Sequence, residues 1–311
     1  VLVDYLGYGY ICVNQEVYHN IHERIALTSV FNTAAVLNYY PNGLADLIYR
    51  SQSQVSWAYP ENAQPIYPYD ATLATAIAEF QLAGYTWDAT NEVFTDVPED
   101  KFKFYLPSDA SAHPAGGVFL DAQAALATIG ITANIINDPN LIANIKKGPV
   151  GIYALAWQSS ADPDMYQVYH YLSQAESVIS NGIVWLYENG DDADLGTIDV
   201  VKLDESTVTM NQKEALEYLA ELIELATKYM LPEERKPIYE KALEVLAQLS
   251  IEIPTYQRKN LFVYDGAIID QTTLSTSVTP YWGPMAEIWK VSFAEGVTGN
   301  QSTTVIVGYE D

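Results

Sequence analysis

The order of elements between residues 102 and 157 constrains the fold more than any other feature of the chain. Hydrophobic periodicity and turn signals predict strands at residues 102–106, 131–136 and 150–157, with helices at residues 116–130 and 140–147 between them. Strands that alternate with helices in this way are typical of units with at least partly parallel pairing. We therefore predict an α/β fold with a mixed sheet flanked by helices.

Further elements are expected on both sides of this region. Before it we predict a strand at residues 5–13, a helix at residues 18–39, an irregular loop at residues 50–69 and a helix capped by Asp70 and closed by Gly84. After it we predict an acidic surface loop at residues 189–204, followed by a helix that opens with a capping box at Thr209–Gln212 and extends to Ala226. A further helix should start at Met230, with Pro237 kinking or shortening its first turn. Strands are expected at residues 253–264 and 287–293, and a polar tail after Gly296.

Size and charge narrow the class of protein. With 311 residues, 49 % of them hydrophobic and 18 % charged, the chain is globular and long enough for two domains. The net charge of −25, from 40 acidic and 15 basic residues, argues against nucleic acid and anionic membranes as partners. No apolar run approaches the roughly 18 to 20 residues of a membrane span, so we expect no direct membrane insertion of this segment.

The chain offers little covalent chemistry. Its single cysteine, Cys12, lies in an apolar run, where a buried structural thiol is expected. The first residues, Val1–Asp4, are neither a start methionine nor a signal peptide.

The segment from Tyr153 to Tyr169 carries the strongest functional signal. An apolar run ends in Trp157, passes through small polar residues and meets Asp162-Pro163-Asp164. This pattern indicates a strand that delivers an indole, hydroxyls and carboxylates to one edge, with the proline in the first turn of a following helix. Such an edge suits a small, partly polar ligand. A plain strand-to-helix corner with a core tryptophan explains the same residues. The candidate ligand-binding residues are Trp157, Ser159, Ser160 and Asp162, with Tyr166 and Tyr169 as weaker candidates for the wall.

Five blocks of sequence resemble family 5 extracellular solute-binding proteins of ABC importers, in the family's order. The resemblance extends over most of the chain, roughly residues 5 to 290; each block is weak by itself, and the five in register are fairly specific. The blocks are Arg24–Leu27, Tyr69–Asp70 through Tyr85, Ile129–Ile131, Trp157–Asp164, and Glu234–Tyr239 through Ile253–Arg258.

The resemblance implies a periplasmic-binding-protein-like lobe (type II, cluster C). Residues 1–265 would form the second ligand-binding lobe of a two-lobe protein, and residues 266–311 would return toward a first lobe and end in a tail. The hinge strands would lie near residues 5–13 and 260–268. The chain would then be a fragment or mature piece whose signal was removed upstream.

The resemblance also implies a function. The chain would belong to an extracytoplasmic binding protein, periplasmic or a cell-surface lipoprotein, that captures a peptide or similar small solute between two lobes and docks on ABC permease subunits. It would not be an enzyme and would need no cofactor. A peptide-sensing protein without transport, or a glycan or peptide hydrolase, remains an alternative.

One departure from the family pattern concerns ligand choice. In peptide-binding members an aspartate shortly after the tryptophan holds the peptide's α-ammonium group. Here the Trp157–Pro163 spacing is one residue shorter, and Ser159 and Ser160 occupy the nearest positions, with Asp162 as a possible substitute. Replacing a carboxylate by hydroxyls forfeits a charge-assisted hydrogen bond of about 1.5 to 3 kcal/mol.

Other sites find weaker support. His19 and His22 share a helix face, yet no third ligand is signalled, and Asp191, Asp192 and Asp194 lack the spacing of a calcium loop. We therefore predict no metal site. No Walker loop, Gly-x-Ser-x-Gly elbow, Rossmann fingerprint or His-Glu-x-x-His is present in the sequence.

Overall fold

A computed structural model of the protein describes residues 1–275, 278–284 and 286–297. The chain divides into two compact units. The larger unit is Leu6–Arg258, and the smaller one combines Val1–Tyr5 with the chain from Lys259 onward.

A mixed sheet forms the centre of the larger unit, with the strand order β11-β2-β8-β6-β7. Strand β6 is parallel to both β7 and β8, whereas β2 is antiparallel to β8 and β11, and β3 pairs with β11. The prediction of an α/β fold with a mixed sheet is therefore confirmed. The strands are β2 (Gly7–Val13), β3 (Ala45–Leu47), β6 (Phe102–Leu106), β7 (Ala133–Asn137), β8 (Ile152–Gln158) and β11 (Glu252–Leu261).

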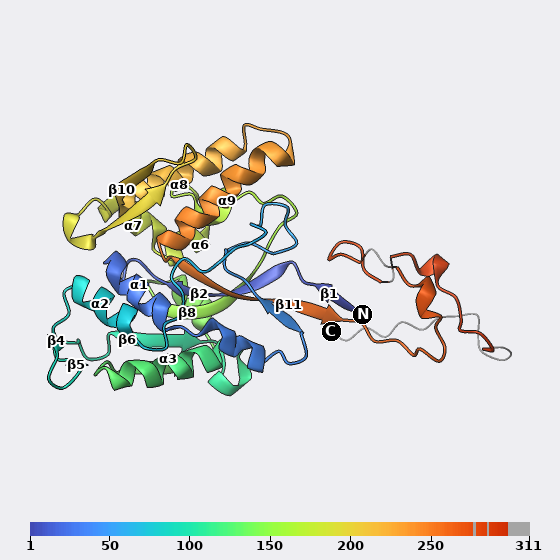
Figure 1. The fold of residues 1–311 in the computed structure, drawn as a ribbon, viewed down its shortest axis with the longest axis horizontal. Coiled ribbons are helices and arrows are strands. Elements are labelled where there is room, and N and C mark those ends of the chain that lie inside the picture. Colours follow the sequence, from blue (N-terminus) through green and yellow to red (C-terminus); the bar gives the residue numbers. More distant parts are fainter. Residues whose placement is uncertain (276–277, 285, 298–311) are drawn as a thin grey trace. The chain divides into compact units, whose positions relative to one another are not determined.

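Three helices pack on one face of this sheet (Figure 1). Alternate side chains of the central strands, among them Ile11, Phe104 and Ile152, are buried in one core with side chains of these helices. Period-2 alternation on the strands and helical spacing on the helices bring the two sets together. The helices are α1 (Ile21–Val30), α2 (Ala74–Leu82) and α3 (Gly116–Thr128).

A second core lies among the helices of the C-terminal half and a β-hairpin, seen in the upper part of Figure 1. Helix α8 contributes Leu216, Leu219 and Leu222 to it, and α9 contributes Leu243 and Leu246. These elements are α5 (Tyr166–Tyr169), α6 (Glu176–Ser180), α7 (Ile183–Asn189), α8 (Gln212–Ala226), α9 (Pro232–Gln248), β9 (Thr197–Val201) and β10 (Thr207–Asn211).

The remaining elements are short. Strand β1 of the smaller unit pairs with the last three residues of β11, from Leu2 opposite Leu261 to Asp4 opposite Lys259. These short elements are β1 (Leu2–Asp4), β4 (Trp87–Asp88), β5 (Val93–Phe94), α4 (Leu141–Ile145) and the 3₁₀ helices η1 (Thr33–Asn38), η2 (Ala110–Ala112), η3 (Ala193–Leu195), η4 (Gln271–Thr273) and η5 (Ile288–Lys290).

Some predicted boundaries were wrong. The acidic segment 189–204 is not all loop, since it contains β9, which pairs with β10. The capping box lies two residues later than predicted, because Asn211 and Glu214 cap α8 reciprocally. The helix predicted over residues 18–39 is α1 followed by the separate 3₁₀ helix η1.

Two further predictions were wrong, one about the effect of Pro237 and one about a strand in the C-terminal segment. Helix α9 begins at Pro232 and continues through Pro237, so this second proline does not shorten it. In place of the strand predicted over residues 287–293, the structure has the 3₁₀ helix η5 at Ile288–Lys290 and an isolated bridge between Phe293 and Ile269. The polar tail predicted after Gly296 lies, except for Val297, outside the described residues.

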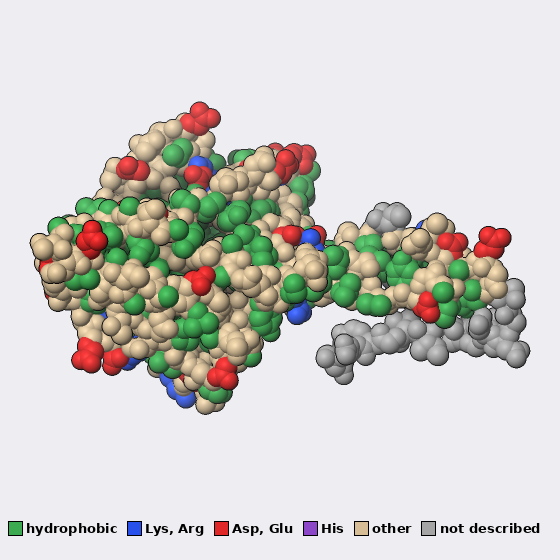
Figure 2. All heavy atoms as spheres, turned by 60° about the horizontal axis from the view of Figure 1, so that its bottom comes forward, with side chains coloured by type: hydrophobic (Ala, Val, Ile, Leu, Met, Phe, Trp, Pro, Cys, Tyr) green, Lys and Arg blue, Asp and Glu red, His purple; other side chains and the backbone are tan. Residues whose placement is uncertain are grey.

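Acidic side chains dominate the charged surface. Figure 2 shows Asp and Glu scattered over one face with few Lys and Arg among them, as the net charge of −25 requires. Among the described residues, no helix combines the length and apolarity needed to cross a membrane.

A fully buried arginine joins the two cores. Arg24 on α1 donates from Nε and one terminal nitrogen to the Leu249 carbonyl at 3.1 Å, and from the other to the carbonyls of Tyr18 and His19 at 2.8 and 2.9 Å. It also donates to the Gln212 side chain at the start of α8. Burial lowers the pKa of Arg24 to about 9. The guanidinium therefore fixes α1 against the start of α8 and the end of α9.

Replacing Arg24 with methionine is expected to destabilise the chain strongly. The change leaves several buried oxygens without donors, which costs about 1 to 3 kcal/mol for each unpaired group, and we expect a total loss near 3 to 5 kcal/mol. Urea unfolding measures it. Lys228→Met, at an exposed position, is the matched control and should change stability by less than about 0.5 kcal/mol. Equal effects of both variants would contradict the role given to Arg24.

Candidate functional site

One edge of strand β8 is only partly paired. Along one side, β8 pairs with β2 throughout, from Ile152 to Gln158. Along the other, it pairs with β6 only at Ile152 and Tyr153. Within the described residues, the stretch from Ala154 to Gln158 therefore has one edge without a neighbouring strand, and Ala156 and Gln158 are exposed there. Such an edge offers backbone donors and acceptors to an added strand.

Trp157 stands beside this open edge. It is half-buried and packs against a small cluster formed by Tyr8, Ile48 and Tyr59. The strand register places Trp157 opposite Tyr8, so both rings lie on the same face of the sheet. The indole is thus held by the unit while part of it remains accessible to a ligand.

The two serines after the strand differ in environment. Ser159 is buried, its backbone N–H donates to the Leu6 carbonyl at 3.3 Å, and its hydroxyl has no hydrogen-bond partner among the described residues. Ser160 is exposed, and its hydroxyl donates to the Asp162 carbonyl at 2.5 Å.

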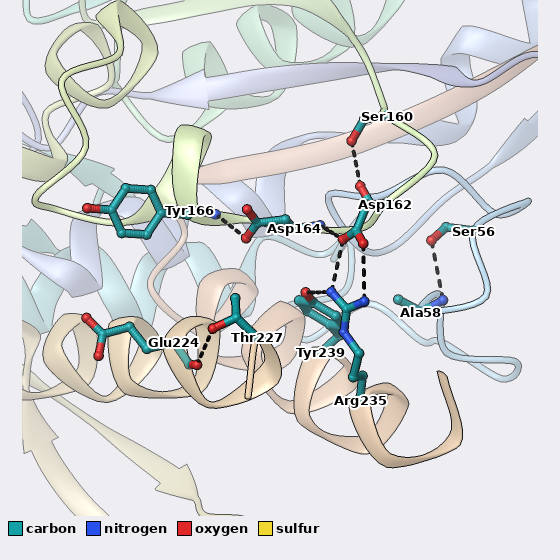
Figure 3. Close-up of polar contacts among 10 residues, drawn as sticks. All are labelled: Ser56, Ala58, Ser160, Asp162, Asp164, Tyr166, Glu224, Thr227, Arg235 and Tyr239. Carbon is teal, nitrogen blue, oxygen red and sulfur yellow. Dashed lines mark hydrogen bonds and ion pairs between the residues drawn. The ribbon is translucent and has the colours of Figure 1, made fainter. Parts of the chain in front are cut away.

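Asp162 is held by an arginine from α9 (Figure 3). Arg235 donates to both carboxylate oxygens of Asp162, at 3.0 and 3.1 Å, and to the Tyr239 hydroxyl at 2.7 Å. The Arg235 side chain is only 14 % exposed, whereas that of Asp162 is 58 % exposed. Hydrogen bonding to Asp162 is the largest cause of the raised pKa of Arg235. This two-point contact pins the loop after β8 to α9.

The helix after Asp162 starts later than the sequence suggested. Helix α5 begins at Tyr166, so Pro163 lies three residues before it and not in its first turn. Met165 is the residue just before the helix, and the Asp164 carboxylate accepts from the Tyr166 N–H at 3.0 Å. Tyr166 is exposed and stacks on His170, with ring centroids 4.4 Å apart.

Tyr169 belongs to a buried polar cluster that the sequence analysis missed. Its hydroxyl donates to Glu252 Oε2 at 2.8 Å and lies 2.9 Å from the Tyr8 hydroxyl. Both Tyr169 and Glu252 are buried. The available signal was an acidic residue, Glu252, inside an otherwise apolar strand run. Burial raises the pKa of Glu252 to about 7, opposed by the nearby hydroxyl groups of Tyr169, Tyr8 and Ser51.

The histidines have other partners. His19 stacks on Trp185 with ring centroids 4.3 Å apart, and His22 Nδ1 lies 2.7 Å from a Glu79 carboxylate oxygen. In the part of the chain that the structure describes, no group of three or more His, Cys, Asp or Glu side chains could hold a metal ion.

The fold and sequence together define a class of protein. The sequence model of the bacterial extracellular solute-binding proteins, family 5 (middle region), matches residues 2–178, more than half of the chain. The chain belongs to this family.

Individual relatives agree with this assignment. The oligopeptide-binding protein AppA of Bacillus subtilis is 25 % identical over 197 residues, which cover 61 % of this chain and 35 % of AppA. The structure of AppA in complex with a nonapeptide matches 95 % of this chain and 52 % of its own, with a TM-score of 0.61 and 18 % identity. HbpA2 from Haemophilus parasuis matches 94 % of this chain and 49 % of its own, with a TM-score of 0.62 and 17 % identity. The chain thus spans about a third of the length of the curated relative and about half of that of these structures.

Stability should depend on pH through Glu252. Because its pKa rises from 4.5 to about 7 on folding, the folded state holds a proton that the unfolded chain releases. Stability is therefore greatest below about pH 4.5 and falls as pH rises toward 7, by roughly 3 kcal/mol for this group. The Glu252→Gln variant should lack this fall. Its free energy of unfolding, measured with urea, should therefore rise relative to that of the unmodified chain as the pH increases between these values. Glu188→Gln, at an exposed position, is the control. Parallel pH profiles for all three proteins would refute the buried carboxyl's role.

Proposed function

We propose that this chain is the second lobe of a two-lobe substrate-binding protein of an ABC importer, which captures peptides or similar small solutes between its lobes. The open edge of β8 beside Trp157 carries this proposal. An extended peptide can add to such an edge through main-chain hydrogen bonds that do not depend on its sequence. The peptide-bound AppA structure supports a peptide over other solutes.

The proposed ligand contacts follow from the exposure of each side chain. Trp157 provides a stacking surface, Ser160 an accessible hydroxyl, and Tyr166 an exposed wall. Ser159 is buried, but its hydroxyl has no hydrogen-bond partner among the described residues and can bond a ligand that reaches it. Tyr169 is buried and contributes indirectly, because its hydroxyl group holds Glu252 and Tyr8 in place.

Asp162 takes a different role from a simple counter-ion. Arg235 already binds both of its carboxylate oxygens, so a ligand ammonium group or hydroxyl can bind Asp162 only by sharing them. We assign Asp162 chiefly to positioning the loop of Ser159 and Ser160. A free peptide N-terminus is then not required for binding.

The remaining parts of the proposal follow from the family. The protein acts outside the cytoplasm, in the periplasm or as a cell-surface lipoprotein, and delivers its ligand to permease subunits. Residues 1–265 form the lobe, and residues 266–311 return toward the first lobe. Closure about the connecting strands buries the ligand. The work is non-covalent capture and not catalysis.

Thermal unfolding of the full-length two-lobe protein tests this function. Short peptides at about 100 times Kd should stabilise the folded state by about 2.7 kcal/mol. Sugars and metal chelates serve as comparison ligands, and stabilisation by these alone would overturn the peptide assignment. Uptake of a labelled peptide by cells with and without the gene separates transport from sensing, because a sensing protein would bind without supporting uptake.

Main-chain pairing makes a sharper prediction. A peptide that binds should lose affinity by about tenfold or more for each edge-facing N–H replaced by N-methyl, because a hydrogen bond is lost and the methyl group blocks close approach. Isothermal titration of a series with one N-methyl group at successive positions should show an alternating pattern, since alternate residues of a strand face the same edge. A uniform response along the peptide would contradict strand addition.

Trp157→Ala should weaken peptide binding by about 2 kcal/mol or more if the indole is the stacking surface. Trp87→Ala is the matched control, because Trp87 packs on Phe94 within the separate β4–β5 hairpin. Titration calorimetry on both variants, after their folding is checked by circular dichroism, gives the comparison. Unchanged affinity in a folded Trp157→Ala variant would remove this residue from the site.

A further inference from the structure

A second feature beside the open edge points to the kind of side chain that the ligand carries. A pocket of about 200 Å³ lies between one face of the sheet and the helices α4 and α6. At about 30 Å³ for each water in the liquid, this is room for a side chain of several heavy atoms. Its lining includes Tyr10, Cys12, Tyr153, Leu155, Trp157 and Ile145.

The strand register explains why these side chains share one face. Tyr10 lies opposite Leu155, and Cys12 lies opposite both Tyr153 on β8 and Glu252 on β11. Directly opposed residues of antiparallel strands point to the same side of the sheet. The pocket therefore has apolar and aromatic walls with the buried carboxyl group of Glu252 among them, while its second carboxyl group, that of Glu176, is paired with Lys146.

Two polar atoms of this pocket lack partners. Glu252 is 6 % exposed, and its Oε1 accepts no hydrogen bond from the described residues, whereas Oε2 accepts from Tyr169. The hydroxyl of Ser177, also in the lining, is buried and unpaired. Buried polar atoms are normally paired, and a buried carboxylate without enough donors is especially costly. Among the described residues neither atom has a hydrogen-bond partner, so both are available to a ligand donor.

The charges around the pocket favour a cationic donor. The lining contains one cationic side chain, Lys146, whose Nζ lies 2.7 Å from Glu176 at the pocket's exposed rim. This pair is neutral overall, so the unbalanced group is Glu252. An ammonium or guanidinium group inside the pocket would neutralise Glu252 and donate to its free oxygen.

Trp157 connects the pocket to the proposed peptide position. Trp157 and Leu155 both line the pocket, and both belong to the stretch of β8 whose edge is open. A strand added at that edge directs alternate side chains to this face of the sheet. We propose, on the basis of the function proposed above, that this pocket receives a lysine or arginine side chain of the captured peptide, with Glu252 as its counter-ion and Ser177 as a second hydrogen-bonding partner.

Calorimetric titration of the full-length protein with alanine-based pentapeptides tests this. A single lysine is moved along the peptide and compared with norleucine, which has the same chain length without the ammonium group, at about pH 8, where Glu252 is ionised. At one position lysine should bind about tenfold or more tighter than norleucine. Glu252→Gln should abolish this preference and leave the norleucine peptide within about threefold of its original affinity. Glu188→Gln, an exposed carboxylate outside the pocket lining, should retain the preference.

A second variant keeps the test decisive if Glu252→Gln does not fold. Ser177→Leu puts a larger apolar side chain into the pocket and leaves Glu252 unchanged in sequence. It should also remove the lysine preference. Equal affinity of lysine and norleucine peptides at every position would overturn the pocket assignment while leaving peptide capture intact. A lysine preference that survives both pocket variants would overturn it too. Failure of every peptide to bind would instead overturn the proposed function itself.

Discussion

The buried guanidinium of Arg24 is the contact on which the rest of the larger unit depends. It joins a sheet-and-helix core to a separate helical core, and its partners are carbonyl and amide oxygens. A buried charge of this kind is tolerated only when its donors are fully used. Fixing α1 against α8 and α9 matters for the site, since β8 contributes to the first core and α9, the helix that carries Arg235, contributes to the second.

Two polar contacts then cross between these cores near the open edge. The Asp162–Arg235 pair is solvent-accessible on one side, so its net contribution to stability is small, about 0 to 1 kcal/mol, and its main effect is to fix the geometry of the loop. The cluster of Tyr8, Tyr169 and Glu252 is buried, and there each unpaired atom is expensive. The first contact sets where the serines lie, and the second leaves a carboxyl oxygen available to a ligand.

Sequence patterns predicted the elements with strong local signals and missed those defined by long-range pairing. Strand β6 was predicted to the residue because its alternation is unbroken. The presence of α8 was predicted because its apolar stripe is regular, although its cap was placed two residues too early. Strand β9 was missed because its two buried apolar residues, Ile198 and Val200, form a pattern too short to stand out from the acidic segment before it, and its only strand partner among the described residues is β10. The residues of the Asp162–Arg235 contact are 73 positions apart in the sequence. The Glu252 cluster joins residues of two strands and one helix, β2, β11 and α5. The acidic residue in an apolar strand run marks Glu252 alone, and no local pattern names the partners in either contact, so only the folded chain brings these residues together.

The proposed basic side chain also agrees with the charge of the whole chain. A net charge of −25 attracts cations over distances up to the Debye length, about 8 Å at physiological ionic strength, and speeds their encounter with the surface. This field does not select a site, because it acts on every cation and is screened by salt. Selection needs a desolvated counter-charge with a free acceptor, and Glu252 meets both conditions inside apolar walls. In the proposed mechanism the surface raises the rate at which basic peptides arrive, and the pocket determines which of their side chains is retained.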